Sequence, residues 1–173
     1  CKLVRSIVGP AGIPVVGIPD NIGGRFSERS PSGDVTSSFA GRDIFKISQG
    51  AHEVLDIYTS TNPKINLALK AACYLYLLNP DYIVVAVQSS NMRAVASVLA
   101  QKFPESWGKG GKGPMVLVCT GQKMLDKMAQ AMENYSAAFI LINVTGEKVK
   151  PLVLKDANLP YLIYTQMGLG EKE

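Results

Sequence analysis

Continuous apolar runs alternate with helical periodicities through the second half of the chain. Runs of strand length are separated by segments in which apolar residues recur every three or four positions, the spacing of one helix face. Uninterrupted apolar runs are typical of parallel strands that are buried on both faces. The pattern predicts strands at 81–88, 114–119 and 137–144, with helices at 90–103 and 121–135 between them. This βαβαβ order predicts an α/β fold, a three-layer αβα sandwich around a mostly parallel, doubly wound sheet.

The first half of the chain is expected to add two helices and one strand. Residues 41–60 and 62–78 show apolar residues at helical spacing. The second of these helices is expected to begin with Asn62 as its cap and Pro63 at its first position, where a missing N–H costs nothing. A short apolar run at 12–19, punctuated by glycine and proline, predicts a buried strand that leads into a glycine turn.

The last part of the chain is expected to complete the edge of the sheet. Residues 145–148 predict a turn between two apolar runs, and 159–166 predicts a final edge strand that makes the sheet mixed. Apart from the glycine-lysine stretch at 108–114, no internal repeat or linker interrupts the pattern, so residues 1–173 are expected to form a single domain.

Composition agrees with one globular domain and excludes some partners. The chain has 173 residues, of which 47% are hydrophobic and 18% charged, and a domain of this size buries about 70% of its unfolded surface. The formal net charge is +4, and the lysines and arginines are dispersed. We therefore expect no nucleic-acid partner, since such partners need massed positive charge.

The apolar segments and the cysteines indicate a cytoplasmic protein. The longest apolar run, 65–78, is too short to span a bilayer and contains Lys70. Cys1, Cys73 and Cys119 are odd in number and far apart, and the last two lie in apolar runs, which is typical of reduced, buried thiols. The chain shows no signal-peptide pattern and begins on what resembles a mid-domain element, so we expect a piece of a larger protein.

Two loops have the composition of a ligand site. In "DNIGGRFS", Gly23 and Gly24 precede Arg25, so a ligand could approach the backbone closely beside a fixed cation. In "QKFPESWGKGGKG", a helix is expected to break at proline and to deliver Glu105 with Gln101 four residues upstream. A carboxylate held by donors in this way could act as a general base.

These two stretches together resemble the signatures of the glucose-6-phosphate isomerase family. The family has a G-G-R-[FY]-S turn after a strand and a later Q-x-x-x-E-S-x-G-K turn, and both occur here in order. The segments "SQGAHEVLD" and "TGQKMLDKMAQAM" also resemble family segments. The resemblance covers nearly the whole chain and has the spacing of the family's second sugar-isomerase domain.

The resemblance implies an activity and a set of site residues. It implies isomerisation between glucose 6-phosphate and fructose 6-phosphate through a cis-enediol, with no cofactor and no metal. Glu105 matches the carboxylate that moves the proton, and Arg25 matches the cation that stabilises the enediolate. Gly24, Gln101 and Lys123 are the expected substrate-binding residues. The implied partners are the sugar phosphate and either a second copy in a homodimer or a complementing isomerase domain.

Departures from the family pattern leave an alternative open. Where the family has a ring-opening histidine, this chain has Lys123, and its single histidine, His52, matches a different helix. Arg29 and Pro31 stand where the family has small or apolar residues. The alternative is therefore a catalytically silent sugar-phosphate-binding module. A nucleotide-binding domain is disfavoured, because no glycine-rich turn with a following acidic residue is found after a first strand.

Overall fold

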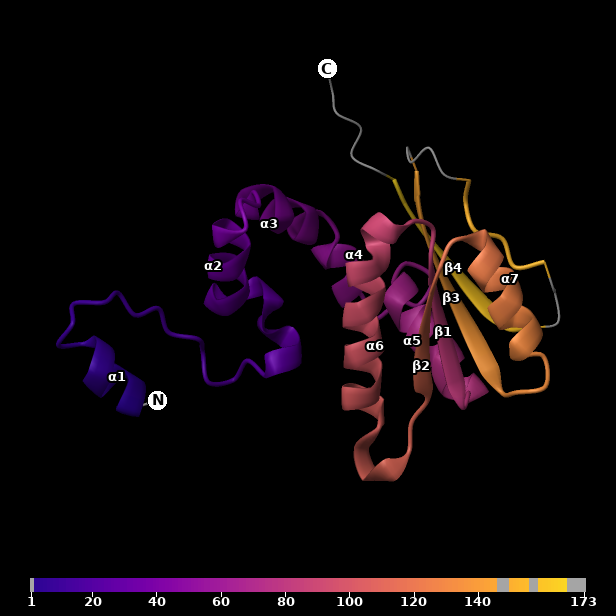
Figure 1. Ribbon diagram of the computed structural model, residues 1–173, viewed down its shortest axis with the longest axis horizontal. Coiled ribbons are helices and arrows are strands. Elements are labelled where there is room, and N and C mark those ends of the chain that lie inside the picture. The colour runs from indigo at the N-terminus through magenta and orange to yellow at the C-terminus, as the bar shows by residue number, and fades with distance from the viewer. Residues whose placement is uncertain (1, 146–149, 156–158, 168–173) are drawn as a thin grey trace, which may run out of the picture. The chain divides into compact units, whose positions relative to one another are not determined.

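The chain divides into two compact units, Cys1–Asn66 and Leu67–Glu173. The computed structural model describes residues 2–145, 150–155 and 159–167. The second unit contains the sheet, and the first consists of short helices and irregular segments (Figure 1). That residues 1–173 form a single domain stays a prediction.

A four-stranded, all-parallel sheet forms the centre of the second unit. Its strands are β1 (Tyr82–Val87), β2 (Met115–Thr120), β3 (Ala137–Thr145) and β4 (Tyr161–Met167), in the spatial order β2-β1-β3-β4. The strands predicted at 81–88, 114–119, 137–144 and 159–166 are confirmed. The predicted mixed edge is wrong, because β4 runs parallel to β3.

The path of the chain before β4 explains this direction. The segment 150–155 is irregular and returns across one face of the sheet. It contacts the carboxyl end of β3, where Asn143 Oδ1 accepts a hydrogen bond from the Leu152 N–H at 2.8 Å. The chain then reaches the amino end, where the Phe139 N–H donates to the Pro160 carbonyl at 3.0 Å. A strand that starts at that end must run parallel to β3. The predicted turn at 145–148 lies, beyond Thr145, outside the described residues.

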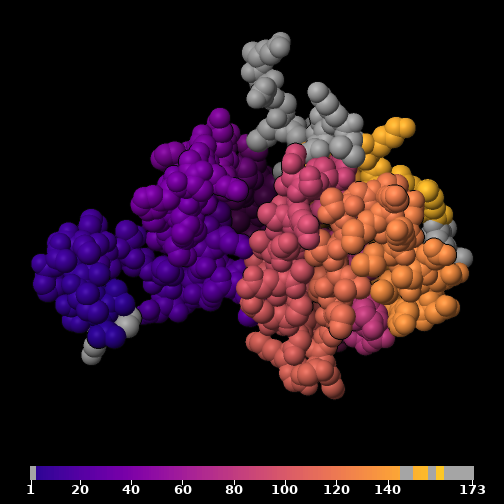
Figure 2. All heavy atoms as spheres, viewed as in Figure 1, coloured from indigo at the N-terminus to yellow at the C-terminus, as the bar shows by residue number. Residues whose placement is uncertain are grey.

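Helices cover both faces of the sheet, which confirms the three-layer sandwich (Figure 1). The helices α5 (Leu67–Leu78) and α6 (Arg93–Trp107) lie on one face, and α7 (Gln122–Ala131) lies on the other. Short 3-10 turns, η2 (Ser90–Met92) and η3 (Lys109–Gly111), flank α6. In the space-filling view α6 and α7, in salmon and orange, form much of the visible surface of this unit (Figure 2).

Successive residues of each strand point to opposite faces of the sheet, so the buried side chains form two cores. One core packs Leu75 of α5 and Ala96 of α6 against one face of the sheet. The other packs Leu125 of α7, with Leu152 and Leu154 of the returning segment, against the opposite face. The fully buried strand residues include Ile83, Val84, Val85, Ala86, Val87, Ala138, Phe139 and Leu141. Burial on both faces is why these strands are apolar without interruption.

Two predicted helix boundaries are wrong. The helix expected from residue 62 begins at Leu67, because Asn62 instead caps a turn by accepting a hydrogen bond from the Lys64 N–H at 3.0 Å. The break expected at Pro104 does not occur, and α6 continues to Trp107. The packing of Phe103 and Trp107 against the α5–α6 core holds this last turn in place.

The first unit contains the glycine turn. Its elements are α1 (Lys2–Val8), η1 (Gly24–Arg29), α2 (Pro31–Phe39), α3 (Ile44–Glu53) and α4 (Leu55–Thr59). The helix predicted at 41–60 is thus two helices that meet at Val54. The strand predicted at 12–19 is wrong: these residues are irregular and exposed. A strand needs a hydrogen-bonded neighbour, and residues 2–66 contain no other strand.

Candidate functional site

The predicted base lies on a helix and is bonded to a predicted substrate-binding residue. Gln101 Nε2 donates a hydrogen bond to Glu105 Oε1 at 2.9 Å. The two residues are four positions apart in α6, which places them on the same helix face. Both side chains are exposed. A carboxylate in this setting is accessible to a substrate and is held by an amide donor.

Glu105 and Lys123 lie beyond opposite ends of strand β2. The helix α6 ends before the amino end of β2, and Glu105 is in its last turn. Lys123 is exposed in the first turn of α7, directly after the carboxyl end of β2. Six strand residues at about 3.3 Å each span about 20 Å. The two side chains therefore do not meet within one copy of this unit.

Arg25 and Gly24 lie in the 3-10 turn η1 of the first unit. The half-buried guanidinium of Arg25 lies over the Phe26 ring, with 5.8 Å from Cζ to the ring centroid. A Cβ added at Gly24 would meet no described atom within 4 Å, and one at Gly23 would meet only the Phe26 side chain, at 3.8 Å. Neither glycine is therefore required by packing among the described residues. That Arg25 and Glu105 share one pocket stays a prediction, since they belong to different units.

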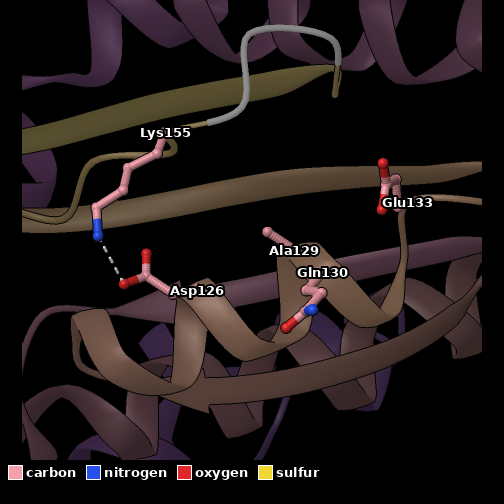
Figure 3. A pocket seen from close by; sticks show the side chains of 5 residues that line it. All are labelled: Asp126, Ala129, Gln130, Glu133 and Lys155. Atoms are coloured by element: carbon pink, nitrogen blue, oxygen red, sulfur yellow. Dashed lines mark hydrogen bonds and ion pairs between the residues drawn. The ribbon is translucent and has the colours of Figure 1, made fainter.

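A shallow groove of about 300 Å³ lies elsewhere, along α7 (Figure 3). Lys155 Nζ lies 2.9 Å from Asp126 Oδ2 across the groove. This hydrogen bond, and a second from Gln122, hold the pKa of Asp126 below its usual value. The lining residues are Asp126, Ala129, Gln130, Glu133 and Lys155. None of the predicted site residues lines this groove.

A buried polar atom that is not among the predicted site residues lies at the carboxyl ends of the strands. Ser89 Oγ, just after β1, is buried and has no hydrogen-bond partner among the described residues. Its neighbour Gln88 is buried too, and its Oε1 accepts a hydrogen bond from the Val144 N–H at 2.7 Å. The signal in the sequence is the polar run that starts at Gln88, directly after five buried strand residues.

Cys73 and Cys119 differ in exposure, and no metal site is found in the part of the chain that the structure describes. Cys119 is buried in β2, and this burial raises its pKa from 9.0 to about 11. Cys73 is exposed on α5, so the prediction that it is buried is wrong. Residues 2–145, 150–155 and 159–167 contain no cluster of three or more metal-binding side chains. None of the described helices combines the length and hydropathy that crossing a bilayer requires.

Curated proteins that match part of this chain share the name glucose-6-phosphate isomerase. No protein-family model matches the chain. A glucose-6-phosphate isomerase of Mycoplasmopsis pulmonis is 39% identical over 98 residues, which are 56% of this chain and 23% of that protein. One of Acholeplasma laidlawii is 32% identical over 120 residues, 68% of this chain and 28% of that protein. The matches thus span about a quarter of the length of these curated relatives.

A solved structure extends the similarity in fold. The crystal structure of a hypothetical protein from Thermus thermophilus has a TM-score of 0.67 and 25% identity. The match covers 88% of this chain and 39% of that one. The resemblance predicted from the two motifs is therefore confirmed, and the chain is related in sequence to part of the glucose-6-phosphate isomerases.

Proposed function

We propose that this chain is part of a sugar-phosphate isomerase that interconverts glucose 6-phosphate and fructose 6-phosphate. The observation that carries the proposal is the Gln101–Glu105 pair, an accessible carboxylate held by an amide 2.9 Å away. It lies in the second of two motifs that occur in the family's order. The names of the partial relatives support the same activity.

The proposed reaction moves one proton between neighbouring carbons and needs no redox partner. Glu105 takes the proton from C2 of the open-chain aldose as the C1=C2 bond forms, and the C1 oxygen becomes a hydroxyl by taking a proton from water, which regains one when O2 later loses its proton. The resulting cis-enediol loses its O2 proton as C2 becomes a carbonyl, and Glu105 returns a proton to C1. A positioned base contributes about a hundred- to ten-thousandfold to such a step.

The other predicted residues have supporting roles in this proposal. Arg25 stabilises the negative charge that develops on the enediolate oxygens, which is the kind of preorganised charge that lowers such barriers. The open space at Gly24 leaves room for the sugar beside the backbone. Gln101 and Lys123 bind the substrate, and no cofactor or metal takes part.

The separation of Glu105 and Lys123 favours a homodimer. A site that uses both residues cannot be built from one copy of the sheet unit, since they lie beyond opposite ends of β2. The length of that strand, about 20 Å, separates them. Two copies could supply Glu105 from one and Lys123 from the other. A complementing isomerase domain is the other proposed partner, and it would supply residues that bind the substrate phosphate.

Lys123 also favours the second candidate function, a silent sugar-phosphate-binding module. At the position of the ring-opening histidine, Lys123 has no imidazole, the side chain that exchanges protons most readily near neutral pH. In that case the chain would bind fructose 6-phosphate without turning it over. Glycolytic and gluconeogenic roles in the cytoplasm belong to the first candidate alone.

A coupled assay distinguishes the two candidates. The purified 173-residue chain is assayed with fructose 6-phosphate, alone and mixed with the N-terminal part of the Mycoplasmopsis pulmonis relative. The chain alone is expected to fold without isomerising, because a phosphate dianion needs several donors. Activity that appears only on mixing supports the isomerase, whereas binding without turnover in every mixture supports the silent module.

Glu105→Gln is the critical variant in the active mixture. The amide keeps the shape of the side chain but cannot take a proton, so turnover is expected to fall about a thousandfold while binding changes little. Glu133→Gln is the matched control, since Glu133 is also exposed but lies just after α7. Unchanged turnover in Glu105→Gln would remove Glu105 from the role of base.

A further inference from the structure

The geometry points to Arg29 as a positioning residue for the η1 turn that carries Gly24 and Arg25. Arg29 is the last residue of η1, four positions after Arg25. Its guanidinium joins this turn to both of the helices that follow it. The inference rests on the proposed function only for the role of Arg25 itself.

Two donors of one guanidinium reach two different helices. Arg29 Nη1 donates to Asp34 Oδ1 of α2 at 2.6 Å, and Nη2 donates to the Ser48 hydroxyl of α3. About two thirds of the surface of the Arg29 and Asp34 side chains is removed from solvent. An ionised donor and acceptor in partial burial make a short, strong hydrogen bond. The planar fork of arginine can serve both partners at once, which a lysine ammonium on a flexible stem does less well.

Close packing makes η1 and the start of α2 one body. A Cβ at Gly33, in the first turn of α2, would overlap the Glu28 carbonyl oxygen of η1. Ser30, which joins the two elements, is 3% exposed, and its hydroxyl donates to the Ser27 carbonyl at 2.6 Å. The carboxyl end of η1 is therefore fixed by packing and by Arg29, whereas Gly23 and Gly24 at its other end are exposed.

The anchor is a polar contact, the ion pair of Arg29 with Asp34. Since Arg29 and Arg25 share one short turn, a shift of the anchor shifts the Arg25 backbone. The position of Arg25 thus depends on this polar contact.

Hydrogen exchange on the full chain tests the anchor without any assumption about activity. The probes are the amides of Phe26 and Ser30, which donate to Gly23 O at 2.9 Å and to Ser27 O at 3.0 Å. Arg29→Met removes both contacts, Ser48→Ala removes the contact to α3, and Arg42→Met is the control at an exposed arginine between α2 and α3. Far-UV circular dichroism checks that each variant folds.

We expect exchange at these two amides to rise at least tenfold in Arg29→Met, by a smaller factor in Ser48→Ala, and not at all in Arg42→Met. In the active mixture, Arg29→Met should lower kcat about tenfold with KM changed less than twofold, because Arg25 acts on the developing charge. Equal exchange in Arg29→Met and Arg42→Met would overturn the inference. Raised exchange with wild-type kcat would overturn the link to Arg25. If the wild-type mixture is inactive, the proposed function fails, and the exchange result still decides the role of Arg29.

Discussion

Replacing Asn143 by alanine should destabilise the sheet unit strongly. Asn143 is 3% exposed at the carboxyl end of β3 and holds the backbone of the returning segment through Leu152. Its Oδ1 accepts from the Leu152 N–H at 2.8 Å, and its Nδ2 donates to the Leu152 carbonyl at 3.4 Å. Leu152 is itself 2% exposed, so water does not replace these bonds easily.

The magnitude follows from these two bonds. A buried donor left without an acceptor costs about 1–3 kcal/mol, and the longer second bond adds at most about 1 kcal/mol. We expect Asn143→Ala to lower the free energy of unfolding by about 1–4 kcal/mol. Urea denaturation measures this loss through the fluorescence of Trp107, the one tryptophan of the chain, which packs against the α5–α6 core.

Gln122→Ala is the matched comparison, because Gln122 makes the same pair of bonds to the next residue. Its Nε2 donates to the Val153 carbonyl at 2.7 Å, and its Oε1 accepts from the Val153 N–H at 2.9 Å. Val153 is 57% exposed, so water can replace the lost partner. The expected cost is below about 1 kcal/mol. A Gln122→Ala loss equal to or larger than that of Asn143→Ala would refute the reasoning that burial sets the cost.

Two further predictions concern titration. Because burial raises the pKa of Cys119 to about 11, iodoacetamide at about pH 8 should label the exposed Cys73 and leave Cys119 unlabelled in the folded chain, and the free energy of unfolding should fall as the pH rises from about 9 to about 11. Labelling of both thiols at the same rate, measured by mass spectrometry, would contradict this. Lys155→Met should raise the pKa of Asp126 toward its ordinary 3.8, as measured by NMR, because the lysine is the largest cause of the lowered value. The stabilisation that this ion pair gives is present above that ordinary value and is lost as the pH falls through the lowered one.

The strands could be predicted from the sequence because burial on both faces leaves an uninterrupted apolar signature. The direction of β4 could not, since it depends on where the returning segment crosses the sheet, and that path is held by contacts such as the one from Asn143 to Leu152. Local rules predict a helix break at Pro104. The packing of Trp107 on the core overrides that local preference.

The candidate site could be predicted only where its residues are close in the sequence. The spacing of Gln101 and Glu105 predicts their hydrogen bond, because four residues make about one helical turn. Arg29 and Ser48 are 19 positions apart, and nothing in the local pattern links them. The unpartnered Ser89 hydroxyl is likewise visible only in three dimensions, among the residues that the structure describes.

Deuterium incorporation tests the central claim, that Glu105 carries the proton between C2 and C1. Fructose 6-phosphate is incubated in D2O with the chain and the complementing N-terminal part of the relative, and NMR follows label at C1 of fructose 6-phosphate and C2 of glucose 6-phosphate. With the native chain and with Glu133→Gln, label should appear at both carbons. With Glu105→Gln, the rate should fall about a thousandfold. Labelling by Glu105→Gln at the native rate would contradict the account.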